Sequence, residues 1–402
     1  MLSSLALIFL VGLAMAAICQ RLMLPRIIGM LLTGIVLGPY VLDLLDPSIL
    51  GISSDLRQMA LIIILLKAGL SLNLSDLKQV GRPAILMSFV PACMEILAFF
   101  LFAPYILGIS RIEAAVMGAV LGAVSPAVVI PRMVSLMDSG YGTKKSIPQM
   151  IMAGASCDDI FVIVLFSTFV SMAQGGSARV MDFINIPVSM ILGVALGSVT
   201  GYFLSRFFET AYAYKHCVRN SMKVIIVLGM SFLLMAVETW LKNVVSVSGL
   251  LAVVSMACVI KIKSISFVSQ RLSEKFGKLW LAAEVILFVL VGAAVDIRYT
   301  LGAGLSAVAI ILIALVFRAV GVLLCMTGTA LNGKERLFCV IAYLPKATVQ
   351  AAIGSVPLAL GLPCGQIVLT VAVLAILITA PLGALGMDFT YRKLLTKDAD
   401  NS

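Results

Sequence analysis

Charged residues are scarce in this chain, and their scarcity excludes most soluble folds. Only 12% of its 402 residues are Asp, Glu, Lys or Arg, whereas 61% are apolar. A soluble core of this length could not bury so much hydrophobic surface. The apolar runs are mostly roughly 16 to 25 residues long and lack the polar alternation of membrane β-barrel strands. The composition therefore predicts an all-α polytopic membrane protein.

Ligands for a resident transition metal are also scarce. The chain has one histidine, His216, which falls in an expected loop. Its eight cysteines stand singly, and no pair has the spacing of metal ligands. We interpret the cysteines as small apolar packing residues and expect no cofactor.

About thirteen apolar stretches are long enough to cross a bilayer as helices. They are residues 2–19, 27–42, 58–73, 82–107, 112–137, 147–172, 184–205, 222–241, 244–260, 280–296, 301–328, 337–360 and 365–387. The first stretch has no Lys or Arg ahead of it, which favours a membrane span over a signal peptide.

Lysine and arginine lie mainly in the loops of one side. The opposite loops hold only Arg57, Arg111, Arg179, Lys242 and Arg298. Because positively charged loops stay in the cytoplasm, the N-terminus is predicted outside and residues 389–402 as a short cytoplasmic tail. The net charge of +10 is then an orientation signal of a multi-pass plasma (inner) membrane protein, and no nucleic-acid partner is expected.

Two adjacent aspartates, Asp158 and Asp159, lie in the middle of the sixth apolar stretch. An ionised carboxylate at that depth costs about 2.5 to 3.5 kcal/mol on insertion scales, so such residues usually serve a function. A buried salt bridge without a transport role is the structural alternative. One base cannot neutralise both acids well, because adjacent helical residues point about 100° apart.

Prolines interrupt the fifth and twelfth stretches in matching ways. Pro126 and Pro345 each lack a backbone donor, so the carbonyls of Gly122 and Ile341 are expected to lose their helical partners. Either break alone is typical of a membrane proline kink.

The two interrupted stretches, the fifth and the twelfth, are seven stretches apart. Because seven is an odd number, corresponding helices cross the membrane in opposite directions, which predicts an inverted repeat. The repeats would cover approximately residues 1–172 and 222–388, joined by a linking helix at 184–205, within one transporter domain over 1–402. This layout places broken helices and a substrate site at the bilayer midplane.

Three segments resemble the cation/proton antiporter superfamily, and are most similar to its NHA-type sodium/proton antiporters. They are Ala155-Ser-Cys-Asp-Asp-Ile160, Leu121-Gly-Ala-Val-Ser-Pro-Ala-Val-Val-Ile-Pro131 and Leu344-Pro-Lys-Ala-Thr-Val-Gln-Ala-Ala352. The resemblance implies a homodimer in membrane lipid, two crossed discontinuous helices and exchange of Na⁺ or Li⁺ for H⁺. It also aligns the constant acid of the family with Asp159, and makes Asp158 its partner.

The residues themselves suit this chemistry. A small hard cation needs oxygen ligands, and the candidates are the carboxylates of Asp158 and Asp159, the carbonyls near Ala123 and Val124, and the hydroxyl of Ser125. Carboxylates in low-dielectric surroundings hold protons more tightly, so protons and cations can compete for them. This predicts alternating-access antiport.

Three further charges lie within the spans. We expect Glu95 and Arg318 to form a buried ion pair that leaves both aspartates free. Several electrogenic relatives carry a lysine that can release its proton at the place of Arg318, whereas arginine stays protonated. Lys346 is expected to offset the negative helix-dipole ends at the crossing.

Other functions could use similar residues. A K⁺/H⁺ antiporter would use the same residues and is the main alternative. An intramembrane aspartyl protease needs two aspartates on facing helices that share one water, which adjacent aspartates on one helix cannot do. The sequence therefore predicts a transporter and not an enzyme.

Overall fold

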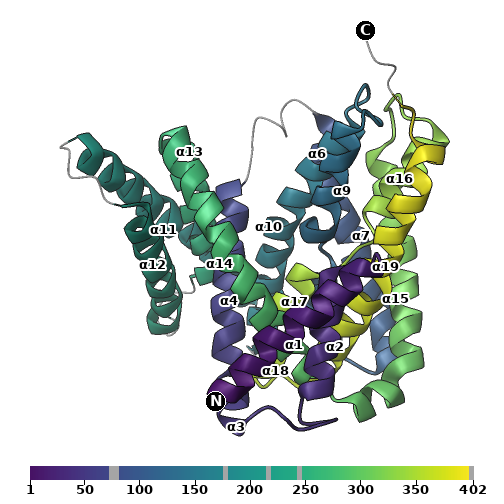
Figure 1. Cartoon of the computed structure of the whole chain (residues 1–402), viewed down its shortest axis with the longest axis horizontal. Helices are drawn as coiled ribbons and strands as arrows, with labels where there is room; N and C mark the ends of the chain where they lie inside the picture. The colour runs from purple at the N-terminus through teal and green to yellow at the C-terminus, as the bar shows by residue number, and fades with distance from the viewer. Residues whose placement is uncertain (72–80, 175–179, 214–218, 242–246, 398–402) are drawn as a thin grey trace. The chain divides into compact units, whose positions relative to one another are not determined.

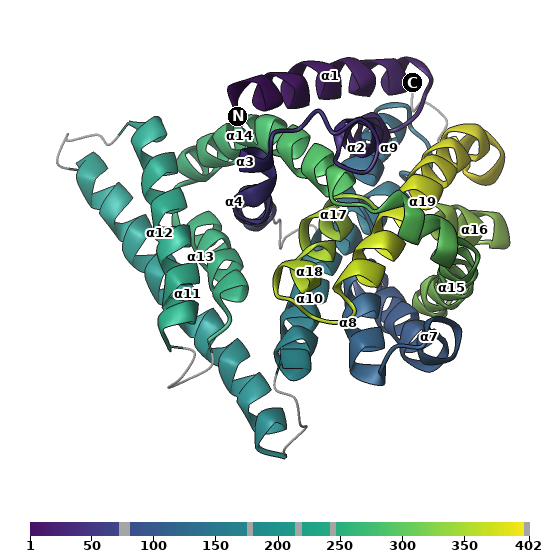
Figure 2. The same cartoon turned by 90° about the horizontal axis from the view of Figure 1, so that it is seen from below.

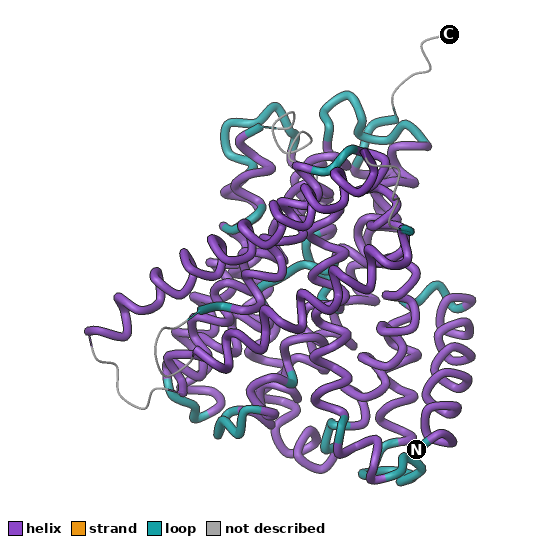
Figure 3. Tube along the Cα trace, turned by 90° about the vertical axis from the view of Figure 1, so that its left-hand side faces the viewer, coloured by secondary structure: helices purple, strands orange, loops and turns teal. Residues whose placement is uncertain are grey.

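The computed structural model describes residues 1–71, 81–174, 180–213, 219–241 and 247–397. Within these ranges the chain forms helices and loops without strands, and one isolated bridge joins Tyr141 to Lys397 (Figure 3). Nine of the described segments are long and apolar enough to cross a membrane, and Arg26–Leu37 and Thr348–Ala359 are apolar but shorter. The predicted all-helical membrane class is confirmed, whereas the count of thirteen spans is not.

The chain divides into two compact units. The first comprises residues 1–54, 73–162 and 287–402, and the second comprises residues 55–72 and 163–286. Helices of the first unit are α1 (Leu2–Arg21), α2 (Arg26–Leu37), α3 (Pro47–Gly51), α6 (Arg82–Met87), α7 (Val90–Leu107), α8 (Arg111–Leu121), α9 (Pro126–Asp138), α15 (Ile297–Cys325), α16 (Gly333–Ala342), α17 (Thr348–Gly354), α18 (Val356–Ala359) and α19 (Gly365–Leu394). Helices of the second are α4 (Ser53–Ser71), α11 (Val180–Ala213), α12 (Asn220–Leu241) and α13 (Gly249–Lys263). Two further helices, α10 (Ile147–Gln174) and α14 (Ser266–Ala293), contribute residues to both units, and the first two residues of α4 also belong to the first unit.

Helices from both halves of the sequence meet in the first unit. Figure 2 shows α7 beside α8 and α15, and α19 beside α16. The short helices α17 and α18 also pack against α19, and α17 contacts α8. Residues far apart in the sequence are thereby brought to one place around α10.

Glycines set the packing of α11 on α13 in the second unit. Gly193, Gly197 and Gly201 recur every four residues, and a Cβ on each would collide with a carbonyl oxygen of Ser248, Ala252 or Met256. Small residues at this spacing let membrane helices approach closely. The stripe explains why α11 and α13 form an extended contact (Figure 1).

The fourth predicted stretch, 82–107, is not one continuous helix. It breaks at Ser88 and Phe89 into α6 and α7. Pro91 is the cause, because it cannot donate to the carbonyl of Met87. The remaining predicted stretches contain helix where they are described, and α19 continues to Leu394, into the expected tail.

Candidate functional site

The first broken helix separates α8 from α9. Residues 122–125 lie outside both helices, just before Pro126, as its missing donor predicts. Two amide groups of this segment point away from the helix axis. The Val124 amide donates to Oδ2 of Asp158 at 2.8 Å, and the Ser125 amide donates to the carbonyl of Pro345 at 2.8 Å. The second bond joins the two interrupted segments directly.

The second broken helix separates α16 from α17. Its break lies at Tyr343–Ala347, around Pro345. The Ile341 carbonyl accepts a bond from the Leu344 amide at 3.2 Å, and the Lys346 amide donates to the Thr379 hydroxyl on α19 at 3.0 Å. Both predicted breaks are therefore confirmed.

The two broken helices begin alike. The α8 N-terminus has a capping box of Ser110 and Glu113, and the α16 N-terminus has one of Asn332 and Glu335. Such boxes satisfy amide groups that have no helical acceptor. The shared device supports the prediction that the two helices correspond to one another.

The acid pair on α10 faces these breaks from a buried position. Asp158 is fully buried and Asp159 is 6% exposed. Asp158 Oδ1, Asp159 Oδ1 and the Ser125 hydroxyl are buried without a hydrogen-bond partner among the described residues. Unpartnered buried oxygens are rare and need a functional or structural reason. Three such oxygens are the donor type that Na⁺ or Li⁺ requires.

A network of charges surrounds Asp158. Arg318 Nη1 lies 2.7 Å from Glu95 Oε2, which is the buried pair expected from the sequence. Arg318 Nη2 also lies 3.4 Å from Asp158 Oδ2. The expectation that the Glu95–Arg318 pair leaves both aspartates free is therefore wrong for Asp158. Lys346 Nζ lies 2.7 Å from Glu95 Oε1, a pairing that the sequence analysis missed. All four side chains are buried.

Side chains of the second half cap three consecutive carbonyls of the first break. Lys346 donates to Leu121, Arg318 to Gly122, and the Gln350 amide to Ala123. Lys346 thus donates to the C-terminal carbonyl of α8, at the negative dipole end that it was expected to offset. The Ala123 carbonyl already has a donor, and Val124 contributes its amide to Asp158. Among the described residues, Asp158 Oδ1, Asp159 Oδ1 and the Ser125 hydroxyl are still without a hydrogen-bond partner, as is the hydroxyl of Tyr343.

Three residues of the site were not identified from the sequence. Tyr343 accepts a bond from Arg318 Nε through its carbonyl at 2.6 Å, Thr379 holds the Lys346 amide, and Gln350 reaches Ala123. Only Gln350 had a sequence signal, because it stands three residues after Ala347 at the start of a helix, where a side chain often bonds back to the backbone.

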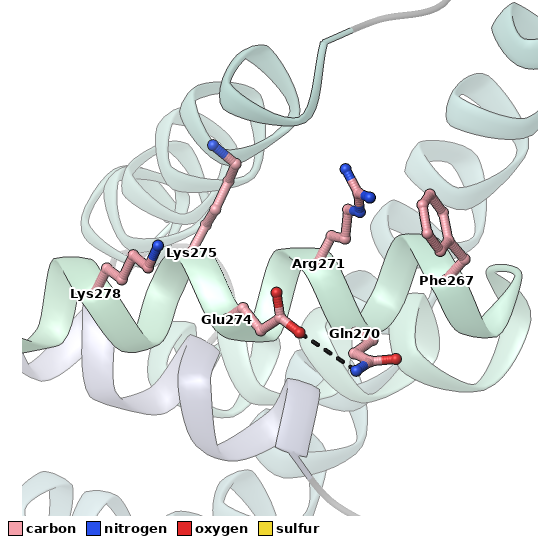
Figure 4. A pocket seen from close by; sticks show the side chains of 6 residues that line it. All are labelled: Phe267, Gln270, Arg271, Glu274, Lys275 and Lys278. Atoms are coloured by element: carbon pink, nitrogen blue, oxygen red, sulfur yellow. Dashed lines mark hydrogen bonds between the residues drawn. The ribbon is translucent and has the colours of Figure 1, made fainter.

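A separate surface cavity of about 390 Å³ lies on α14 (Figure 4). It is lined by Phe267, Gln270, Arg271, Glu274, Lys275 and Lys278. Glu274 accepts a bond from Gln270 at 3.3 Å. Three basic side chains and one engaged acid do not suit a cation, and the cavity contains none of the residues of the acid-pair site.

Among the described residues, no group of three or more His, Cys, Asp or Glu side chains lies close enough together to hold a metal ion.

Comparison with known proteins decides the family. Residues 5–392 match the transmembrane sodium/hydrogen exchanger family. The chain belongs to this family. It is 36% identical over 390 residues to human sodium/hydrogen exchanger 9B2, covering 93% of this chain and 70% of that protein. It is 34% identical over 400 residues to human sodium/hydrogen exchanger 9B1, covering 94% and 74%.

A solved exchanger shares the fold. The sodium proton antiporter MjNhaP1 from Methanocaldococcus jannaschii at pH 8 matches with a TM-score of 0.82 and 21% identity, over 98% of both chains. The similarity to this antiporter and to the NHA-type relatives confirms the recognised superfamily and its helical fold. Members of the sodium/hydrogen exchanger family are transporters.

Proposed function

We propose that this chain is a secondary antiporter that exchanges Na⁺ or Li⁺ for H⁺, with both ions competing for Asp158 and Asp159. The observation that carries the proposal is the set of three unpartnered buried oxygens, Asp158 Oδ1, Asp159 Oδ1 and Ser125 Oγ, beside two interrupted helices. The relatives are described as sodium exchangers or antiporters, which favours Na⁺ over the K⁺ alternative.

The charge balance of the buried residues supports a single site shared by a cation and a proton. Glu95 and Asp158 pair with Arg318 and Lys346, and the neighbouring Asp159 adds one further carboxylate, so one negative charge remains when all five side chains are ionised. One monovalent cation or one proton neutralises that charge. An empty site would carry an uncompensated buried charge, which is costly, so loaded states are favoured for crossing.

The test is proton flux in everted membrane vesicles with a pH-sensitive dye. Addition of Na⁺ or Li⁺ should dequench the dye in wild-type vesicles, and Asp159→Asn at equal protein level should abolish the response. Asp158→Asn should impair it severely. Asp138→Asn, an exposed acid at the end of α9, is the matched control and should respond like wild type. Cation-driven flux at wild-type level in Asp159→Asn would falsify the assignment.

Four finer features are also proposed. They are a homodimer in membrane lipid, location in the plasma (inner) membrane, an N-terminus outside with a cytoplasmic C-terminus, and an inverted repeat of residues 1–172 and 222–388 around a linking helix at 184–205. The positive-inside distribution of charge supports the orientation. The matching breaks and capping boxes of the two broken helices support the repeat.

A further inference from the structure

Gln350 joins the two interrupted segments through a single side chain. It lies in the first turn of α17 and is fully buried. Its Nε2 donates to the Ala123 carbonyl at 2.7 Å, and its Oε1 accepts from the Ala347 amide at 2.7 Å. Both ends of the amide are therefore satisfied, one in each break.

The residue that Gln350 holds is next to the residues that shape the ion site. Val124 follows Ala123 and fixes Asp158 Oδ2 with its amide, and Ser125 carries one of the three unpartnered oxygens. A shift of the Ala123 carbonyl would therefore move a donor to Asp158 and a candidate ligand together.

The same bond also occupies a carbonyl that would otherwise be available to a cation. Carbonyl oxygens are good ligands for Na⁺ and K⁺, and the number of available oxygens helps to set which ion size is preferred. With Ala123 engaged by Gln350, the small set of carboxylate and hydroxyl oxygens favours a small cation.

We propose that Gln350 is a positioning residue that sets the ion selectivity of the site. Its bond to the Ala123 carbonyl fixes the position of Ser125 relative to the acid pair, and the same bond prevents that carbonyl from binding the cation. This inference rests on the proposed cation site at Asp158 and Asp159. A simpler role is that Gln350 only caps α17 through its Oε1.

Two substitutions separate these roles. Gln350→Met keeps the length of the side chain and removes both hydrogen bonds. Gln350→Glu keeps the oxygen that accepts from Ala347 and removes the amide donor to Ala123, but it also places a carboxyl group at a fully buried position. The uncharged Gln350→Met therefore carries the positive test, and unchanged transport in Gln350→Glu would show that the donor to Ala123 is not needed. Gln366→Met is the matched control, because the Gln366 Nε2 has no partner among the described residues.

The experiment measures KM and maximal rate for Na⁺ and Li⁺ in proteoliposomes at alkaline pH, with wild type and Asp159→Asn alongside. Of the two bonds that Gln350→Met removes, the bond to Ala123 is the one next to the ion site, and loss of one buried hydrogen bond corresponds to about five- to tenfold in an equilibrium constant. Gln350→Met should raise the Na⁺ KM by about that factor, raise the Li⁺ KM further, and change the maximal rate less than about twofold. Gln350→Glu should change the ratio of the two KM values, and Gln366→Met should change neither.

The outcomes separate the two proposals. If Gln350→Glu keeps the wild-type KM values and their ratio, Gln350 is only a cap and the inference is overturned, even where Gln350→Met fails to fold. Unchanged KM values in Gln350→Met, or a loss confined to the maximal rate, also overturn it. If Asp159→Asn retains exchange, the proposed function itself is overturned. If Asp159→Asn is inactive but the Gln350 variants have the KM values of wild type, the proposed function stands and only the inference about Gln350 is overturned.

Discussion

Glu95 holds two basic side chains at once, and this determines what its removal should do. Arg318 and Lys346 both lie 2.7 Å from its carboxylate, inside the first unit. The sequence predicted the pair with Arg318 because an intramembrane arginine needs a partner. It could not predict that Lys346 shares the acid, because side-chain direction at a broken helix depends on tertiary packing.

Glu95→Gln should therefore strongly destabilise the protein. It removes the nearest carboxylate from two buried cations, and removal of one member of a buried pair typically costs about 3 to 5 kcal/mol. Adding Lys346→Met should recover part of the loss, because Arg318 still has Asp158 at 3.4 Å. Thermal unfolding in detergent measures both, with the exposed Glu274→Gln as a control that should unfold like wild type. Losses that simply add in the double variant would contradict the shared acid.

The Ser125 hydroxyl offers a milder test of the ligand set. It is buried without a partner, so Ser125→Ala removes no hydrogen bond from the described residues. The melting temperature should stay close to that of wild type. The Na⁺ KM should rise by about five- to tenfold, because one hydrogen bond or polar contact usually contributes about that factor to an equilibrium constant. Flux assays and thermal unfolding on the same preparation decide the case. A stability loss without a change in KM would assign Ser125 to packing.

The sequence identified the residues of the site better than their roles. Asp158, Asp159 and Ser125 could be singled out because charge and broken backbone are costly in a membrane. The Ala123 carbonyl was expected as a free ligand, yet Gln350 engages it from another part of the chain. Such contacts over long sequence separation do not follow from local patterns.

At the scale of helices, prolines explain the observed breaks, including one that the sequence analysis passed over. Pro126 and Pro345 break their helices as expected, and Pro91 breaks the stretch that was predicted to be continuous. Pro104, Pro131 and Pro381 lie inside helices without ending them. Proline therefore permits a break in a membrane helix, and neighbouring contacts decide whether it occurs.

The glycine stripe of α11 should be essential for the second unit. A Cβ at Gly197 would collide with the backbone of Ala252, so Gly197→Val should push α11 away from α13. We expect a loss of about 1 to 3 kcal/mol, the usual cost of overpacking, and a lower melting temperature in detergent. Gly229→Val on α12 is the control, since a Cβ there meets nothing within 4 Å. Equal melting temperatures for the two variants would show that the close approach is not needed.

At the scale of the whole molecule, the predicted orientation can be tested across one broken helix. Ser110 and Ser139 are both exposed and flank α8 and α9. In a background without the eight native cysteines, Ser110→Cys should react with a membrane-impermeant reagent only from outside, and Ser139→Cys only from the cytoplasm. Labelling of both from one face would remove the odd offset on which the inverted repeat depends.

The central claim is that a cation and a proton compete for one acid pair, and the pH dependence of the Na⁺ KM tests it most directly. Protons occupy the site as pH falls, so on the acidic side the Na⁺ KM should rise by about tenfold per pH unit while the maximal rate at saturating Na⁺ stays constant. The measurement is initial exchange rate against Na⁺ concentration in proteoliposomes over a series of pH values. A Na⁺ KM that stays constant with pH while the maximal rate changes would contradict a shared site.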